Sequence, residues 1–248
     1  MQTLIKFENF CLWNSEKSFY ENVNFCINQG DKYIFIGPNG SGKTLLMEIM
    51  QMGISREMAK KYGNLHVSGN ILDANGNDLL RPSQDEARKI SYVSQFASFL
   101  ENCTVKEQIY NECCYLCGDV QECEMAELIY AFDSKIELNR KIKGHLSGGE
   151  EKIIQLVSGI IKARRANVLL LDEPLNHLAF KNSAIFNDIL KDEIKKNPQL
   201  AIVMITHCRA MDFAENEMHY DHNAKQFIIR PYLSYDCFSL ANNNICTC

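Results

Sequence analysis

The chain has 248 residues, of which 46% are hydrophobic, and a formal net charge of −5. This length supplies a large core for one domain with subdomains, and the negative charge argues against a broad electrostatic surface for nucleic acid, leaving only a local basic patch open. No apolar run approaches the roughly 18–20 residues that cross a bilayer, and the N-terminus lacks a signal-peptide pattern. We therefore expect a protein that is soluble, or attached to a membrane only through a partner.

The first part of the chain predicts antiparallel strands followed by a strand–turn–helix unit. Residues 3–36 alternate apolar and polar positions around two short turns, which indicates two or three antiparallel strands. Residues 32–37 (KYIFIG) predict a buried strand that ends at glycine, and residues 44–54 predict a buried helix. Residues 63–80 and 89–96 return to strand patterns, the former with an Asn-Gly turn.

The second part of the chain predicts alternating helices and strands. Residues 104–143 are mostly helical in pattern, and the apolar runs at 168–171 and 201–206 each follow a helical segment. Such alternation is typical of a parallel sheet. Residues 217–231 predict a last hairpin, and the final residues, NNNICTC, are expected to pack loosely.

Eleven cysteines are a high count, and reduced thiols are expected because the rest of the chain is typical of a cytosolic enzyme. Cys114 and Cys117 have a CxxC spacing that zinc could use. The surrounding segment is also helical in pattern, where cysteine serves as a small hydrophobic residue. We favour packing over a metal site, and the sequence leaves both open.

The stretch GPNGSGKT, residues 37–44, fits the phosphate-loop pattern GxxxxGK[ST] between a predicted strand and a predicted helix. Its glycines allow a tight turn whose N–H groups face an anion, and the helix start adds partial positive charge. Lys43 is placed to reach the β- and γ-phosphates, and the Thr44 hydroxyl to ligate Mg²⁺. The residues expected to bind the nucleotide here are Gly37, Pro38, Asn39, Gly40, Ser41, Gly42, Lys43 and Thr44.

Two adjacent carboxylates end the most apolar run, LLLDE at residues 169–173. A carboxylate at the carboxyl end of a parallel strand, beside a phosphate loop, can hold Mg²⁺, which is the role expected of Asp172. Glu173 follows directly and could accept a proton from an attacking water or orient it. The sequence therefore predicts a site for hydrolysis of a nucleoside triphosphate.

These residues, together with LSGGE at 146–150, Gln95 after a strand and Thr206-His207 after another, resemble the ATP-binding cassette (ABC) ATPases. The order and spacing match across almost the whole chain. The resemblance implies an α/β P-loop NTPase fold of the ABC type, with a mainly parallel core sheet and an antiparallel β-subdomain in residues 1–103 and 145–248. Residues 104–144 would form a helical subdomain, and the cofactors would be ATP and Mg²⁺.

The resemblance also implies a head-to-tail dimer in which two subunits enclose the nucleotides. Ser147, Gly148 and Gly149 would meet the γ-phosphate bound to the other subunit's phosphate loop, as a serine hydroxyl and N–H groups at a helix start can. Trp13 falls near the aromatic residue on which adenine stacks, with Phe10 as the alternative and plain strand packing as another.

Three further residues receive roles from the same resemblance. Gln95 would contact Mg²⁺ and the attacking water, Glu173 would be the catalytic glutamate, and His207 would lie near the γ-phosphate.

The chain departs from the family pattern at two positions. Ile153 stands near the arginine that usually follows the family's signature, here LSGGE at 146–150. Ala179 stands where the family often has an aspartate that couples the two sites. We expect a competent but slow ATPase.

The function expected from the resemblance is that of an ATPase subunit that powers an ABC transporter. It would bind a second ABC subunit and a separate transmembrane permease, lie in the cytoplasm at the inner face of the membrane, and not bind nucleic acid directly. The alternative is a soluble ABC ATPase acting on ribosomes or nucleic acid, because residues 176–178 (NHL) resemble a stretch of the ABC-F translation factors. A third interpretation is a degenerate cassette that only binds ATP, against which the intact Lys43, Asp172, Glu173 and His207 argue.

Overall fold

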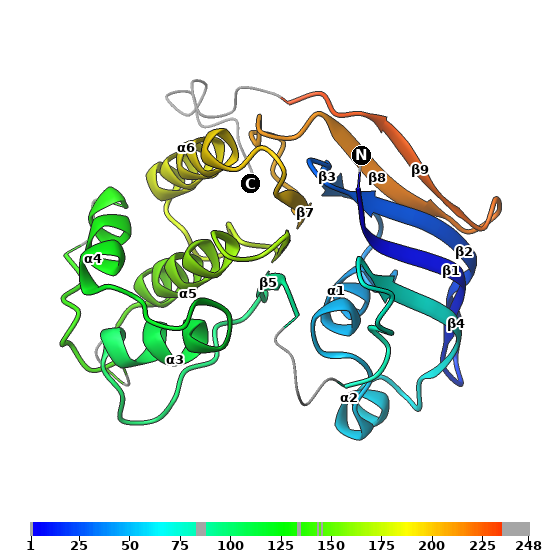
Figure 1. Ribbon diagram of the computed structural model, residues 1–248, viewed down its shortest axis with the longest axis horizontal. Helices are drawn as coiled ribbons and strands as arrows, with labels where there is room; N and C mark the ends of the chain where they lie inside the picture. The colour runs from blue at the N-terminus through cyan, green and yellow to red at the C-terminus, as the bar shows by residue number, and fades with distance from the viewer. Residues whose placement is uncertain (1, 83–87, 133–134, 143, 145, 235–248) are drawn as a thin grey trace.

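The computed structural model describes residues 2–82, 88–132, 135–142, 144 and 146–234. Two sheets and a set of helices make up this part of the chain (Figure 1). The smaller sheet has the order β2-β1-β4 and is antiparallel throughout. Its strands are β1 (Thr3–Trp13), β2 (Ser18–Asn28) and β4 (His66–Asp73). The predicted antiparallel pair at the start of the chain is therefore confirmed.

The larger sheet has the order β5-β6-β7-β3-β8-β9. All neighbouring strands are parallel except β9, which runs antiparallel to β8 and forms the predicted last hairpin. The strands are β3 (Lys32–Phe35), β5 (Ile90–Val93), β6 (Val168–Asp172), β7 (Ala201–Ile205), β8 (Asn216–Asp221) and β9 (Gln226–Pro231). The predicted mainly parallel core sheet is confirmed, and β3 belongs to it rather than to the antiparallel strands before it.

The core forms on both faces of this larger sheet, because successive side chains of a strand point to opposite faces. In β6, Leu169 and Leu171 face one apolar cluster, whereas Val168 and Leu170 face the other. The first cluster is completed by α3 (Val105–Cys117), α4 (Glu122–Ala131), α5 (Gly148–Ala163) and α6 (Phe180–Lys196). The second lies between the two sheets around α1 (Lys43–Met52).

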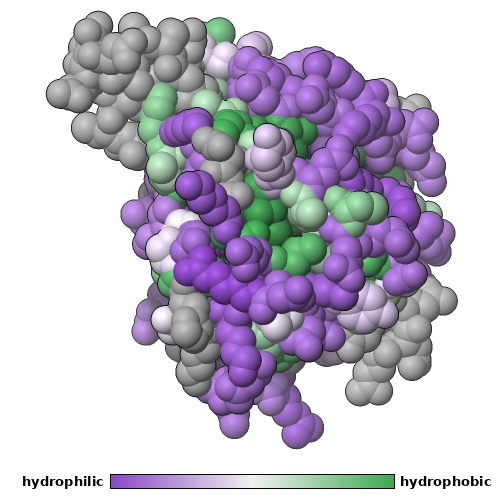
Figure 2. Space-filling model, turned by 90° about the vertical axis from the view of Figure 1, so that its left-hand side faces the viewer, coloured by the Kyte–Doolittle hydropathy of each residue, from purple (hydrophilic) through white to green (hydrophobic). Residues whose placement is uncertain are grey.

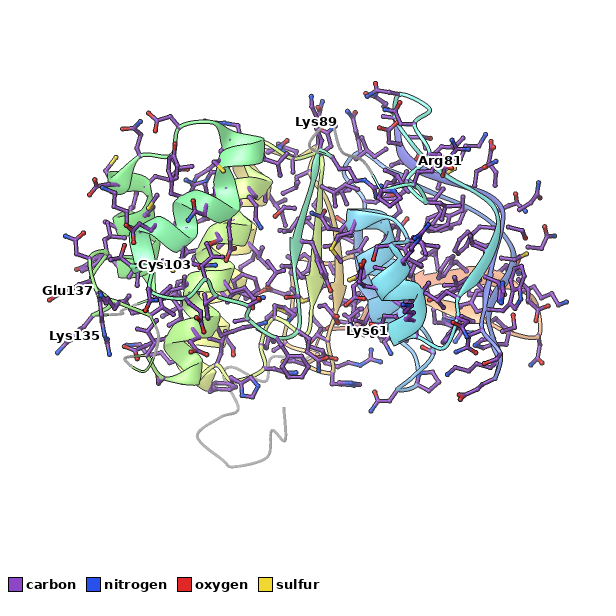
Figure 3. All side chains as sticks on the ribbon, turned by 90° about the horizontal axis from the view of Figure 1, so that it is seen from below. Lys61, Arg81, Lys89, Cys103, Lys135 and Glu137 are labelled. Atoms are coloured by element: carbon purple, nitrogen blue, oxygen red, sulfur yellow. The ribbon has the colours of Figure 1, made fainter. Side chains whose placement is uncertain are left out.

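The two sides of the sheet are separated in Figure 3, where its strands are seen nearly edge-on. Cys103 and Lys135 lie on the side of α3, α4 and α5, while Lys61 lies with α1 and α2 on the other side. Figure 2 shows the helical side as a largely polar surface with apolar residues gathered in a hollow at its centre. Within the described residues, no helix combines the length and apolar character needed to cross a bilayer.

Two segments differ from what the sequence pattern predicts. A short helix, α2 (Arg56–Lys61), precedes β4 and was not predicted; Ser55 caps it by accepting from Met58 N, and six residues are too few to show a helical period. After α4 the described residues up to Ile142 form no helix, although residues 104–143 predict one. They return along the start of α3 instead, where Val105 N donates to Arg140 O at 3.0 Å.

Two cysteines of α3 pack against α5, whereas Cys123 at the start of α4 is exposed. Cys113 is fully buried with its Sγ 3.5 Å from Ser158 O, and Cys117 Sγ lies 3.6 Å from Ile161 O, so both face α5. The described residues contain no group of three or more potential ligands placed to hold a metal ion. The last residues, including Cys246 and Cys248, lie outside the described part.

Candidate functional site

The phosphate loop connects β3 to α1 and leaves the start of that helix open. Gly42 is the N-cap of α1, has φ 94°, and supplies no side-chain cap. A Cβ at this position would lie 2.9 Å from Phe19 Cδ1, so the close approach of strand β2 also requires glycine. The first N–H groups of α1 are thus turned toward the site with no side chain capping them, which suits an anion.

Lys43 lies at the base of this loop. Its Nζ donates to the carbonyl oxygens of Gly37 at 2.8 Å and Pro38 at 3.0 Å, and the residue is buried. Burial lowers the pKa of Lys43, and the negative charges of Glu173 and Asp172 act in the opposite direction. The ammonium is therefore held against the loop and close to the acidic residues that end β6.

A cavity of about 780 Å³ lies at the carboxyl ends of β3, β6 and β7, where ligands bind in open α/β sheets. It brings together ten of the residues that the sequence predicts for the site. They are Asn39, Gly40, Ser41, Gly42, Lys43, Thr44, Gln95, Asp172, Glu173 and His207. Gly37 and Pro38 stand behind this lining and contribute the carbonyl groups that hold Lys43.

Asp172 is the last residue of β6 and is completely buried. Its Oδ2 lies 3.5 Å from the Tyr92 hydroxyl, and the Thr44 side chain also donates to the carboxylate. Among the described residues, its Oδ1 has no hydrogen-bond partner. Burial raises the pKa of Asp172, because an ionised carboxylate is disfavoured away from water unless a cation or donors compensate it.

Glu173 is held in an uncommon backbone conformation, with φ 46°, and its N–H donates to Ile205 O at 2.9 Å. The Glu173 Oε1 lies 3.2 Å from His207 Nε2, and its side chain is mostly buried while that of His207 is exposed. Burial raises the pKa of Glu173, and the charge of His207 opposes this shift. A carboxylate with a raised pKa, on a residue with a strained backbone and with a histidine beside it, is typical of a reacting group.

Gln95 follows β5, and its side chain lines the same cavity. The loop that carries it is held from α5 by two buried side chains, Lys152 and Gln155. Burial lowers the pKa of Lys152 to about 8. The sequence pattern does not indicate a role for Lys152, which directly precedes the departure from the family pattern at Ile153.

Several lining residues were not predicted, and they form the outer end of the cavity. Lys17, in the turn between β1 and β2, donates to Gly40 O at 2.6 Å. Tyr62 follows α2, with its hydroxyl 2.9 Å from Glu48 Oε2 and its carbonyl accepting from Asn14 Nδ2 at 2.8 Å. Nothing in a sequence pattern indicates that these two segments meet, because that contact depends on how the small sheet packs over α1.

Trp13 does not line this cavity. Its ring stacks on His66, with centroids 5.7 Å apart, and it borders a neighbouring depression that shares Asn14 and Lys17 with the cavity. Phe10 is completely buried in the core of the small sheet, so it is not available to a base. Stacking of adenine on Trp13 stays a prediction.

The signature residues lie apart from the phosphate loop. Ser147 is the N-cap of α5, with a capping box to Glu150, and Ser147 and Gly149 line a separate cavity of about 440 Å³ with His177 and Ala179. A Cβ on Gly149 would lie 3.2 Å from His177 O, so this helix start and the segment after Glu173 are packed closely. In one chain the phosphate loop and the signature residues thus line two separate cavities.

Ala179 is the N-cap of α6 and provides no side-chain acceptor for the helix. We expect Ala179→Asp to raise the free energy of unfolding by about 0.5–2 kcal/mol, because its backbone is already extended and a carboxylate would cap the first turn. Thermal and denaturant unfolding measure this, with Ala179→Asn as the uncharged control. An aspartate variant no more stable than the parent would contradict it, and a faster ATPase rate in the same variant would support the expectation that Ala179 slows hydrolysis.

The fold and the cavity together define a P-loop nucleotide-binding protein. The family model for ABC transporters matches residues 20–176. A probable iron chelatin transport ATP-binding protein of Helicobacter pylori is 25% identical over 215 residues, covering 82% of this chain and 77% of that protein. A ribosome protection protein of Bacillus subtilis is 35% identical over 165 residues, but these cover 66% of this chain and only 25% of that protein.

Solved structures agree on the fold. A structure of the ATP-binding subunit of an ABC transporter superposes with a TM-score of 0.71 at 18% identity, over 92% of this chain and 90% of that one. The chain therefore belongs to the ABC transporter family, as an ATP-binding cassette ATPase.

Proposed function

We propose that the chain hydrolyses ATP to power a membrane transporter through a separate transmembrane partner. The observation that carries the catalytic part is the meeting of the phosphate loop, the Asp172–Glu173 pair and His207 in one cavity. Relatives with the same cassette are named as transport ATP-binding proteins, such as the iron chelatin protein of Helicobacter pylori.

The residues of the cavity divide the chemistry among them. The loop N–H groups and Lys43 bind the phosphates and stabilise their negative charge. Glu173 orients the attacking water and accepts its proton, and burial supports this role by raising the pKa of that carboxyl. His207, which contacts Glu173, keeps the carboxylate in place. We propose that it also contacts the γ-phosphate, because it lines the same cavity as the phosphate loop.

The acidic residues also fit a bound Mg²⁺ ion. We propose that Thr44, Asp172 and Gln95 hold it, because Asp172 presents a buried Oδ1 that has no partner among the described residues and Mg²⁺ prefers oxygen ligands. The ion would neutralise phosphate charge when it is bound. Asp172 is held in place by its contacts with Thr44 and Tyr92, and the loop of Gln95 is held by Lys152.

A second ABC subunit would complete the site. Ser147 and Gly149 lie in a cavity separate from the phosphate loop of the same chain, as the predicted head-to-tail arrangement requires. We propose that these signature residues bind the nucleotide held by the partner subunit. Gly148, at the same helix start, would contribute its N–H group.

The surface beside Gln95 suits an apolar partner. Phe96 and Leu100 follow Gln95 with 70% and 53% of their surface exposed, and Tyr110 on α3 is also exposed. Gln108 holds this loop to α3 by accepting from Leu100 N at 2.9 Å. We propose that the transmembrane subunit contacts these side chains, so that the protein lies at the cytoplasmic face of the membrane.

Cell fractionation with Glu173→Gln tests this proposal, since that form should retain ATP and stay associated with its partner. We expect it to sediment with membranes and to bring down a multi-span protein. Sedimentation with ribosomes would instead favour the soluble alternative. The similarity to a ribosome protection protein supports that alternative only in part, because the 35% identity extends over a quarter of that protein. The parent chain and a phosphate-loop variant, Lys43→Ala, serve as controls.

A further inference from the structure

The loop that carries Gln95 is held by two neighbouring side chains of α5. Lys152 Nζ donates to the carbonyl oxygens of Ser94 at 3.0 Å and Gln95 at 3.3 Å, and to Gln155 Oε1 at 3.0 Å. Gln155 Nε2 donates to Ser94 O at 3.0 Å and Ser94 Oγ at 2.9 Å, and reaches Phe96 O at 3.4 Å. Three consecutive residues of the loop are thus bonded to one helix.

Lys152 is an uncommon residue at such a place. It is 2% exposed, and a buried ammonium is strongly disfavoured unless all of its donors are satisfied. Its three acceptors equal the three N–H groups that an ammonium carries, so the bonding is complete. Asp172 and Glu173 add favourable charge from the end of β6.

The two side chains are not equivalent in what they hold. Gln155 bonds to Ser94 and Phe96, whereas Lys152 provides the hydrogen bond to the Gln95 carbonyl in the described structure. Removing Lys152 therefore frees the peptide of Gln95 itself while its neighbours stay tethered.

The helix that carries Lys152 begins at the signature. Ser147 is its N-cap, and α5 packs against β5, the strand that leads into Gln95. We propose that Lys152 is a positioning residue that fixes Gln95 in the ATP cavity and links it mechanically to the signature end of α5. This inference rests on the proposed role of Gln95 in hydrolysis.

The test is Lys152→Met, which keeps the length of the side chain and removes its donors and charge. Because a misplaced group of about 1 Å can cost up to about 100-fold in rate, we expect kcat for ATP to fall about 10- to 100-fold. The KM for ATP should stay within about threefold, since the phosphate loop is untouched. Lys152→Gln, which keeps an amide donor, should recover part of the rate.

The matched control is Lys162→Met, the same substitution near the other end of α5, where the lysine lies 3.9 Å from Glu112. It should leave both kinetic constants unchanged. A Lys152→Met protein with the parent kcat overturns the proposal, as does a joint loss of kcat and ATP affinity that follows a lowered melting temperature. If that variant does not fold, a Lys152→Leu protein, which also lacks the donor, that folds and shows the parent kcat overturns the proposal instead.

Different experimental results would show that the proposed function itself is wrong. If the parent chain does not hydrolyse ATP, the proposed function is wrong, and this inference falls with it. If the parent is active and Gln95→Ala keeps its full rate, only the role of Gln95, and with it that of Lys152, is overturned. An active parent, a slow Gln95→Ala and an unaffected Lys152→Met would reject the positioning role alone.

Discussion

Glu173→Gln is expected to lower the rate of ATP hydrolysis by about 10²–10⁴-fold while ATP still binds. The amide has nearly the shape of the carboxylate but cannot accept a proton from water. Phosphate release and the dissociation constant for ATP, measured on the same preparation, check this prediction. The result would separate an active ATPase from a cassette that only binds nucleotide.

The structure supplies the reason that binding should survive. Glu173 contacts His207, and Lys43 is held by the carbonyl groups of Gly37 and Pro38, which the substitution leaves unchanged. Glu127→Gln on the exposed surface of α4 is the matched control and should hydrolyse ATP at the parent rate. Equal rates for the parent and Glu173→Gln, or a loss of ATP binding, would contradict the proposed role.

Asp172→Asn is expected to raise the Mg²⁺ concentration needed for half-maximal hydrolysis by about 10- to 100-fold. Losses of metal affinity of about this size are typical when residues that hold or orient metal ligands are mutated. The same change should leave the melting temperature of the protein without nucleotide unchanged or raised. The reason is that Asp172 is completely buried, its Oδ1 has no partner among the described residues, and an ionised carboxylate in that position is costly.

Hydrolysis as a function of free Mg²⁺ at fixed ATP, together with thermal unfolding, measures both effects. The control is Asp188→Asn, because Asp188 is exposed and lies outside the cavity. Its Oδ1 forms an ion pair with Lys191 Nζ of the same helix, α6, at 2.9 Å. An unchanged Mg²⁺ dependence would remove Asp172 from the proposed metal site. A large fall in melting temperature would show that the carboxylate stabilises the fold instead.

Local sequence was sufficient for the elements that carry their own signals. The phosphate loop is specified by glycine at Gly42, where the backbone has φ 94° and a neighbour leaves no room for a Cβ. The parallel strands are short continuous apolar runs, such as β6, and they are recognisable because both of their faces are buried. Asp172 and Glu173 are consecutive in the sequence, so their placement together at the end of β6 could also be predicted.

Short or exposed segments were less predictable. The helix α2 has six residues, too few for a period, and its role as a wall of the cavity depends on Asn14 reaching Tyr62 O. The return of the chain after α4 is decided by backbone bonds to the start of α3, such as Lys106 N to Leu138 O at 2.9 Å. Propensity is a weak guide where such tertiary bonds are available.

What the sequence by itself determined is the set of candidate site residues and their order along the chain, because each motif is local. Only the tertiary structure decided which of them share a cavity. It gathers Gln95, Asp172 and His207 at one edge of the larger sheet, and it sets Ser147 apart at the start of α5. It also turns Lys152 inward, since the direction of a side chain on a buried helix depends on what packs against it.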